Sequence, residues 1–336
     1  MSDSDVIILD SGMKSELINR EITLGGYYEF DNDSNDLHAS EDFTDNNGHG
    51  TACGLAVCKV SPKTKLHVIK LLNDNIQSSF VKLIEALQFC DKLEPRIINL
   101  SLATLDARDI SKITSLENVC EKLTRNGKII VSSVYNGCTT SWPARFNSVI
   151  GVRGAILKND SEYWFNKENE VQCIASMVPI FTSRILNENC YFGGNSKSAA
   201  IITGLISNIV DENVGINIDE LIDMLSERAT KNYWTEDDVN TSLNEFIFDT
   251  GKREYDMDSA RKIIELLNPL LNKQMVISDL SLNKKLWEIG LSKCHVPVIL
   301  NSLEEIFNIK IDDATLNFST FKSVYNLLEL IEENKK

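Results

Sequence analysis

Short apolar segments and amphipathic helical patterns alternate through the first half of the chain, and this alternation leaves few folds open. The apolar segments are rich in β-branched residues and lie at 6–9, 66–72, 97–102, 128–134 and 148–152. Strands that are apolar on both sides suit a parallel sheet with both faces covered. Helical patterns lie between them at 78–93 and 113–127, and the second ends on a glycine, where a helix C-cap belongs. We therefore predict an α/β fold with a doubly wound parallel sheet and right-handed crossovers.

The charge of the chain excludes two classes of partner. Its 336 residues leave room for a large domain and a small one, and the net charge is −15. Such a chain offers no basic stripe to nucleic-acid phosphates or to an anionic membrane surface. The apolar run from Val6 to Leu9 is too short for a signal peptide, and no stretch reaches the length of a membrane span. We expect a protein that binds neither nucleic acid nor membrane.

The cysteines indicate the compartment. There are eight, scattered along the chain, with no C-x-x-C pair and no metal-ligand spacing. Without an export signal, reduced and mostly buried thiols are a better explanation than disulfides. We therefore predict a cytoplasmic protein with no bound metal and no cofactor.

Polar residues follow two of the predicted strands. Asp10 follows the first apolar segment, and Asn136 follows the fourth. In an open α/β sheet, ligands bind beyond the carboxyl ends of the strands. Taken singly, Asp10 is better explained as a strand-end cap and Asn136 as a turn residue. A functional role for Asp10 and Asn136 depends on whether other reactive side chains lie at the same edge of the sheet.

A histidine between two glycines and a serine at a predicted helix start are candidates for the same catalytic site. His49 lies between Gly48 and Gly50, ahead of a small-residue segment that could open a helix. Glycine neighbours let another backbone or a substrate approach the ring closely. Ser196 follows a glycine pair at the start of an apolar, small-residue helix at 192–210. Aspartate, histidine and serine in this chain order are the parts of a serine nucleophile, its base and the carboxylate that orients the base.

Five segments resemble, in order and at plausible spacing, the signature blocks of subtilisin-like serine peptidases. The resemblance covers roughly residues 5 to 230, and it implies a subtilisin-like fold and a serine endopeptidase. The five segments read ILDSG (8–12), GHGTACGLA (48–56), INLSLA (98–103), VYNG (134–137) and GNSKSAAIITG (194–204).

The resemblance assigns roles to nine residues. It implies that Asp10, His49 and Ser196 form the catalytic triad. It implies that the side-chain amide of Asn136 donates a hydrogen bond to the oxyanion. The residues that it places along the substrate are Ser101, Leu102, Ala103, Ser133 and Tyr135.

Several positions depart from the family pattern. Asn195 replaces a threonine before the serine, and Ile201 replaces a proline after it. Tyr135 and Ala103 each replace a glycine near the substrate. We expect these changes to alter the specificity pocket rather than the triad. A phenol in the pocket would favour small residues on the acyl side of the cut, unless Tyr135 points away and leaves the pocket open.

Two expectations concern features of some relatives. The acidic segment at 30–45 could bind calcium, but it has no calcium-loop spacing, so we favour a solvated loop. Secreted relatives fold with an N-terminal pro-segment, whereas Asp10 is the tenth residue here. We therefore expect that the chain either folds without such a segment or is supplied already trimmed.

The C-terminal part has a different pattern. After a helical pattern at 217–230 the chain turns polar and poorly patterned, and amphipathic helices then return at 256–271 and 319–334. We predict a peptidase domain at 1–252 and a small helical bundle at 253–336.

The helical region resembles an acyl or peptidyl carrier protein, on the segments LWEIGLSK and LEEIFNIKI. That family attaches phosphopantetheine to a serine, where this chain has Lys293, and Ser292 replaces the preceding aspartate. We expect no phosphopantetheine, because an ammonium group cannot form the phosphodiester. The domain is then a docking module for a protein partner or, alternatively, a helical cap that stabilises the peptidase.

Together these observations predict a cytoplasmic serine endopeptidase that acts on a peptide or protein precursor. By analogy, the maturation of a ribosomally made peptide is one such task. The alternative is a binding scaffold on a subtilisin fold that has lost catalysis. A working carrier protein is disfavoured by Lys293.

Overall fold

The computed structural model describes residues 4–31, 36–105, 109–157, 159–244, 255–278, 282–316 and 318–335. The chain forms two compact units. The first comprises Met1–Val178 and Gly193–Phe246, and the second comprises Pro179–Phe192 and Ile247–Lys336. The expected boundary between residues 252 and 253 lies outside the described residues.

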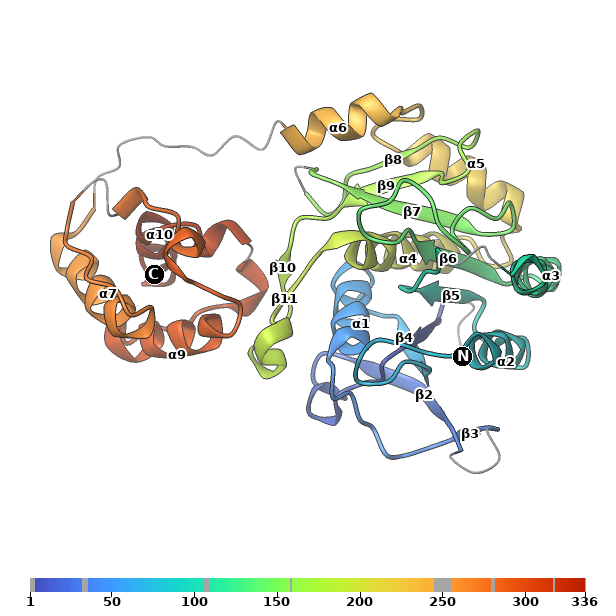
Figure 1. Ribbon diagram of the computed structural model, residues 1–336, viewed down its shortest axis with the longest axis horizontal. Helices are drawn as coiled ribbons and strands as arrows, with labels where there is room; N and C mark the ends of the chain where they lie inside the picture. The colour runs from blue at the N-terminus through green and yellow to red at the C-terminus, as the bar shows by residue number, and fades with distance from the viewer. Residues whose placement is uncertain are drawn as a thin grey trace. The chain divides into compact units, whose positions relative to one another are not determined.

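The first unit is built on a large, mostly parallel sheet (Figure 1). Among the described residues the sheet has nine strands, in the order β3-β2-β4-β1-β5-β6-β7-β9-β8. Only the outermost pairs, β2 with β3 and β8 with β9, are antiparallel. The strands are β1 (Val6–Asp10), β2 (Thr23–Phe30), β3 (Leu37–Ala39), β4 (Lys65–Lys70), β5 (Ile97–Leu100), β6 (Ile129–Ser133), β7 (Ile150–Ala155), β8 (Tyr163–Phe165) and β9 (Cys173–Ser176). The α/β fold with a mostly parallel sheet is therefore confirmed.

The apolar segments of the sequence form the centre of this sheet. Every residue of β1, β5 and β6 is buried. β2 was not anticipated because its burial alternates, as befits a strand near an edge. β3 lies within the acidic segment that was expected to be a loop, and residues 32–35 of that segment are outside the described residues.

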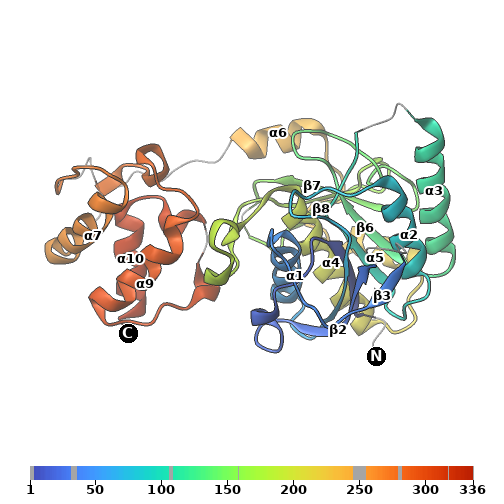
Figure 2. The same cartoon turned by 60° about the horizontal axis from the view of Figure 1, so that its bottom comes forward.

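Helices cover both faces of the sheet. α2 (Phe80–Cys90) and α3 (Ile110–Arg125) lie side by side on one face (Figure 2), where Leu87 and Leu116 pack in one core with Ile98 of β5. Asn99, the next residue of β5, points to the opposite face and donates a hydrogen bond of 2.8 Å to Thr203 Oγ1. Successive side chains of a strand point to opposite faces of the sheet. Ile98 and Asn99 therefore contact helices on opposite faces, so the sheet is doubly wound.

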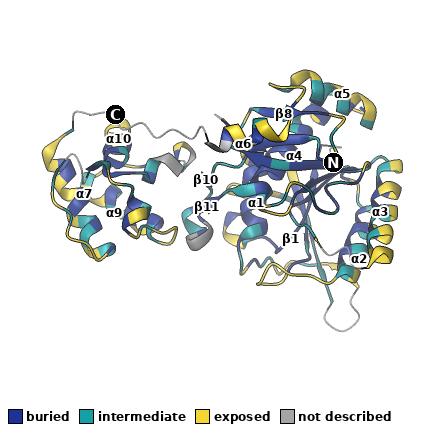
Figure 3. Ribbon diagram, turned by 45° about the horizontal axis from the view of Figure 1, so that its top comes forward, coloured by how far each residue is buried: buried dark blue, intermediate teal, exposed yellow. Residues whose placement is uncertain are grey.

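The helix that carries Thr203 is α4 (Gly194–Glu212), which Figure 3 shows buried along most of its length. It packs against α1 (His49–Val60), and a Cβ at Gly204 would lie 2.8 Å from the Val60 side chain. Glycine at this position lets the two helices approach closely. Both helices start at the edge of the sheet where β1 and β5 end.

The polar region after α5 (Ile218–Arg228) contains a helix that was not predicted, α6 (Glu236–Asn244). Its apolar periodicity is weak because few of its residues face a core. Val239 packs with Trp234 and Ile174 in a small cluster. Glu236 also forms an ion pair with Arg153 of β7.

The second unit is a helical bundle with one hairpin. Its helices are α7 (Met257–Leu270), α9 (His295–Phe307) and α10 (Val324–Asn334), and its hairpin is β10 (Ile180–Phe181) with β11 (Tyr191–Phe192). The strongly amphipathic faces of these helices form one apolar core. In the part of the chain that the structure describes, no helix is long and apolar enough to cross a membrane.

Candidate active site

Asp10 and His49 meet where β1 ends and α1 begins. Asp10 is fully buried, and its Oδ1 lies 2.7 Å from His49 Nδ1. The backbone N–H of Ser11 donates a further hydrogen bond of 2.8 Å to the same oxygen. The carboxylate is therefore fixed from two sides and holds the Nδ1 edge of the imidazole.

The two glycines around His49 serve the turn into α1. Gly48 has a φ of +86°, and a Cβ on Gly50 would lie 2.5 Å from the carbonyl oxygen of Gly12. The close approach inferred from the sequence is thus between α1 and the backbone that follows β1. This packing carries the ring of His49 to Asp10.

Asp45 organises the same turn, and sequence reasoning missed it. Its Oδ1 accepts hydrogen bonds from Gly48 N (2.7 Å) and Ser11 Oγ (2.9 Å). Its Oδ2 accepts from both the backbone N–H and the hydroxyl of Thr51. Asp45 is buried, so this carboxylate ties the end of β1 to the first turn of α1. An acidic residue shortly before a helix start was the only signal for it.

Charges around His49 favour its protonated form. Burial lowers the pKa of His49, but the Asp10 carboxylate outweighs burial and raises that pKa well above the ordinary value. Cys53 lies in the next turn of α1, with its Sγ 3.4 Å from Asp10 Oδ2. Burial raises the pKa of the Cys53 thiol to about 11, so the thiol is neutral near pH 7. Asp10 is therefore the charge that acts on the imidazole.

Asp10, His49 and Cys53 also have the donor atoms of a metal site. Their ligand atoms all lie within 4.8 Å of one another. A metal ion bound there would compete with the hydrogen bond between Asp10 and His49. The cluster is therefore compatible with metal binding only at the expense of that hydrogen bond.

Ser196 lies in the first turn of α4. Gly194, two residues earlier, has a φ of +76°, which makes the sharp turn into the helix. Ser101 follows β5, and its hydroxyl contacts Ser196 O at 3.3 Å. Because β5 is the direct neighbour of β1, Ser196 reaches the edge at which Asp10 and His49 meet. Unpaired N–H groups and the positive end of the helix dipole lie at this helix start.

Asn136 contacts the same helix start. Its Oδ1 accepts a hydrogen bond of 3.1 Å from the backbone N–H of Asn195, the residue before Ser196. With the oxygen used as an acceptor, Nδ2 is the group that can donate to a ligand. The predicted oxyanion donor is therefore held beside the predicted nucleophile.

Asn195 and Ile201, which depart from the family pattern around the serine, are both buried. Ile201 is 1% exposed within α4. Asn195 is also buried; its Nδ2 donates to Val134 O (2.9 Å) and its Oδ1 accepts from Gly154 N (2.8 Å). The side-chain amide of Asn195 thus hydrogen-bonds the backbone just after β6 and the backbone of β7. Because both of its polar atoms have partners, this polar side chain can be buried. Ser198, expected to serve helix packing, is buried and contacts Ser176 O.

The predicted substrate residues differ in exposure. Leu102 and Ala103 are partly buried, whereas Ser101 and Ser133 are buried. Tyr135 is 51% exposed, and its backbone N–H donates a hydrogen bond of 2.9 Å to Ser141 Oγ. The turn that carries Tyr135 is thus fixed by its backbone while the phenol remains accessible.

The sequence was compared with known families and proteins. The profile of the Subtilase family matches residues 2–246, most of the chain. The chain belongs to the subtilase family. Subtilisin DY of Bacillus licheniformis is 24% identical over 203 residues, which cover 56% of this chain and 72% of that protein. Subtilisin-like protease 3 of Plasmodium falciparum is also 24% identical, over 55% of this subtilase but only 28% of its own length.

Solved structures agree on the fold. A cold-adapted subtilisin-like serine proteinase matches with a TM-score of 0.51 and 17% identity, covering 70% of this subtilase and 86% of that chain. The epidermin leader peptide processing serine protease of Staphylococcus aureus matches with a TM-score of 0.54 and 15% identity. The match covers 66% of this subtilase and 68% of that chain. A lanthipeptide protease matches with a TM-score of 0.53 and 13% identity, and the match covers 67% of this subtilase and 80% of that chain. Its membership of the subtilase family and its similarity to subtilisins make the chain a serine-type peptidase, a hydrolase that acts on peptides or proteins.

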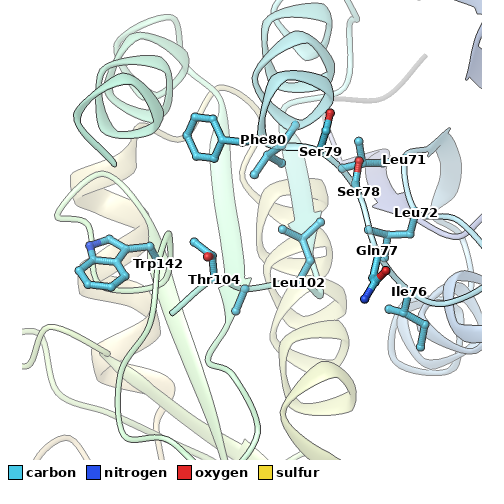
Figure 4. Close-up of a pocket in the computed structure, with 12 residues that line it drawn as sticks. Leu71, Leu72, Ile76, Gln77, Ser78, Ser79, Phe80, Leu102, Thr104 and Trp142 are labelled. Carbon is cyan, nitrogen blue, oxygen red and sulfur yellow. The ribbon is translucent and has the colours of Figure 1, made fainter. Parts of the chain in front are cut away.

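A cavity of about 440 Å³ lies beside the predicted substrate segment of the subtilase (Figure 4). Leu102 and Thr104 form one side, Phe80 and Trp142 contribute aromatic rings, and Ile76 lies on the opposite side. Ile76 is exposed and has a φ of +58°, which is rare for a β-branched residue. The cavity has a mixed polar and apolar lining and is large enough to hold a peptide side chain.

Proposed function

We propose that this subtilase is an endopeptidase whose triad consists of Asp10, His49 and Ser196, with Asn136 as an oxyanion donor. The single observation that carries the proposal is the 2.7 Å contact between Asp10 and His49 at the edge that Ser196 reaches. The contact of Asn136 Oδ1 with the backbone before Ser196 supports the role of its amide.

Each residue then has a defined step. Ser196 Oγ attacks the carbonyl carbon of the scissile bond while His49 takes its proton. Asp10 holds the imidazole tautomer and stabilises the imidazolium. Asn136 Nδ2 and the N–H groups at the start of α4 donate to the oxyanion, and one such side-chain donor contributes about 3 kcal/mol. His49 then protonates the leaving amine as the C–N bond breaks, and water hydrolyses the acyl-enzyme.

We further propose that the substrate is a peptide or protein precursor, cut selectively. Two structural neighbours are described as a leader peptide processing protease and a lanthipeptide protease, which is consistent with such a role. The accessible phenol of Tyr135 and the cavity beside Leu102 supply the means to select side chains. The free and mostly buried cysteines suit a cytoplasmic location.

The helical region at 253–336 is proposed to be a carrier-like domain without phosphopantetheine. α9 begins at His295, and Lys293 stands in the loop before it, where the resemblance places the modified serine. Ser292 Oγ is engaged with Cys294 Sγ and His295 Nδ1. Docking of a protein partner remains part of this proposal.

Covalent labelling with a fluorophosphonate tests the peptidase mechanism. We expect one label per chain, and we expect none in Ser196→Ala or His49→Ala. Ser292→Ala is the matched control, because Ser292 is another serine with a histidine 3.2 Å away, and it should label like the wild type. Equal labelling of Ser196→Ala would refute the assignment. A folded wild-type protein that takes no label would instead support the scaffold alternative.

A further inference from the structure

The residue after the proposed nucleophile is a buried lysine. Lys197 lies in the first turn of α4, one position after Ser196, and its side chain is fully buried. Burial of an ammonium group is costly unless the group is paired and hydrogen-bonded. The proposed mechanism gives this ammonium group no step, so its role has to follow from its partners.

The partners of Lys197 all belong to the first unit. Its Nζ donates to Val178 O at 2.7 Å, forms an ion pair with Asp160 and reaches Ser176 Oγ at 3.4 Å. Asp160 lies between β7 and β8, whereas Ser176 and Val178 lie at and just beyond the end of β9. Burial lowers the pKa of Lys197, and the Asp160 carboxylate acts against this change. The ammonium group thus ties the first turn of α4 to two segments of the same unit.

The residues before Ser196 are anchored in the same way. Gly194 N donates to Met177 O at 3.0 Å, next to the carbonyl that Lys197 bonds. The buried amide of Asn195 bonds the backbone just after β6 and the backbone of β7. Ser196 is therefore flanked on both sides by a buried polar side chain that holds the start of α4 against the sheet.

The chain itself gives this turn little support. Two glycines, Gly193 and Gly194, precede it, and Gly194 has a φ of +76°. Glycine has more backbone freedom than any other residue, so this pair does not fix the direction of the chain. The first unit is also interrupted here, because its residues run to Val178 and resume at Gly193. Lys197 bonds the carbonyl of Val178, the last residue before this interruption.

We propose that Lys197 is a positioning residue for Ser196. Its bonds to Val178 O and Asp160 hold the first turn of α4, so that Ser196 Oγ stays within reach of His49 and of the substrate carbonyl. Loss of these bonds displaces Ser196 Oγ without removing any group that acts in the mechanism. This inference rests on the proposed role of Ser196.

The test is the kinetics of fluorophosphonate labelling in the full-length protein. Lys197→Met keeps a long side chain in the buried site but removes the ammonium group. We expect its maximal labelling rate constant to fall about tenfold to a hundredfold, since small misplacements of a reacting group have effects of this size. The reagent concentration at half-saturation should stay near the wild-type value, because the lost alignment acts on the transition state.

Lys128→Met is the matched control. Lys128 is also a buried lysine of the first unit, and its Nζ donates to two backbone carbonyls, Pro95 O at 2.9 Å and Leu93 O. It directly precedes β6, at the edge of the sheet opposite to the one that Ser196 reaches. Lys128→Met should therefore lower the stability of the protein while the folded fraction is labelled at the wild-type rate.

Two further measurements keep the test decisive. If Lys197→Met does not fold, Asp160→Asn removes only the charge of a partner whose side chain is 28% exposed, and it should slow labelling by a smaller factor. Hydrogen exchange of the amides at the start of α4 reports on the turn without any need for catalysis. Exchange there should be faster in Lys197→Met and unchanged in Lys128→Met.

The outcomes separate positioning from stability. A lower rate constant with a complete labelled fraction in Lys197→Met, but not in Lys128→Met, supports positioning. A smaller labelled fraction with an unchanged rate constant means that Lys197 only stabilises the fold, and it overturns the inference, as does an equal fall in both variants. A wild-type protein that takes no Ser196-dependent label would refute the proposed function itself, and hydrogen exchange then decides whether Lys197 holds the turn.

Discussion

His49 stands between two carboxylates of different function. Asp10 holds its ring, and Asp45 holds the turn from which it projects. Cys53 packs against Asp10 from the next helical turn without adding charge. The imidazole is thus oriented by Asp10, which raises its proton affinity, and the turn that carries it is held by Asp45.

The proton affinity of His49 predicts the pH dependence of the reaction. Only the neutral imidazole can accept the proton of Ser196 Oγ, so the labelling rate should rise with pH through the pKa of His49. Because Asp10 raises that pKa, the midpoint should lie above pH 6.5, and Asp10→Asn should lower both the midpoint and the maximal rate. Because the pKa of His49 is higher in the folded than in the unfolded protein, the pairing of protonated His49 with Asp10 stabilises the fold below the unfolded pKa. This stabilisation is lost as the pH rises through the folded pKa.

Measurement of the labelling rate from pH 5 to pH 10 checks this prediction. Cys53→Ser is the control, and it should leave the midpoint in place because the thiol is uncharged. A wild-type midpoint below pH 6.5 would contradict the role given to Asp10.

Tyr135 leads to a prediction about the substrate. If the phenol occupies the pocket for the residue on the acyl side of the cut, glycine, alanine and serine should be preferred there. Overfilling a site costs about 1–3 kcal/mol, which is about tenfold to a hundredfold in kcat/KM. A peptide library read by mass spectrometry checks the preference, and Tyr135→Gly should extend it to larger residues. Equal cleavage after large and small residues would show that the ring points away.

Motif residues could be predicted from the sequence because they follow strands and start helices. Asp10 and Asn136 were placed at strand ends, and the structure has them there. Asp45 was missed because it is one of several acids in its segment, and the pattern does not tell which of them is buried. The bridging role of Asn195 was missed because its partners are backbone atoms of Val134, just after β6, and of Gly154 in β7, whose proximity arises only in the fold.

At the scale of elements, β2 and β4 meet through an unusual pair. His67 of β4 is buried, and a Cβ on Gly25 of β2 would lie 2.1 Å from its Nε2. The register between the strands shifts at this point. Burial lowers the pKa of His67, so the ring is neutral where it packs on the glycine.

This packing predicts the effect of two substitutions. Gly25→Ala should lower the free energy of unfolding by roughly 1–3 kcal/mol, as overpacking does. His67→Ala alone should destabilise the protein by leaving a cavity, but the double variant should be more stable than the sum of the two changes implies. Urea denaturation of the four proteins measures the coupling. Strict additivity would show that the ring moves aside.

The elements that the sequence predicted are those with a strong period. β1 and β4 to β7 are short and mostly apolar, and α2, α3, α7 and α10 have clear apolar faces. The elements that were missed are short or lie at edges, among them β3, β8 and α6. Their stability comes from neighbours that are distant in sequence, such as the ion pair of Glu236 with Arg153, so a local pattern does not show them.

For the whole molecule, the sequence indicated two parts but not how the chain is divided between them. The change from strand-and-helix alternation to amphipathic helices is visible in the pattern after residue 252. The hairpin of Pro179–Phe192 is too short to carry a pattern of its own. Only the packing of Phe181 and Tyr191 with the helices assigns it to the second unit.

The hairpin also sets an order of events during synthesis. Chains emerge from the ribosome from the N-terminus, and domains fold as they appear. Phe181 and Tyr191 are made before any of α7, α9 and α10, so their apolar partners do not yet exist when Ser196 emerges. The hairpin therefore acquires its final apolar support only after α7, α9 and α10 have been translated, although it is made before all three of them.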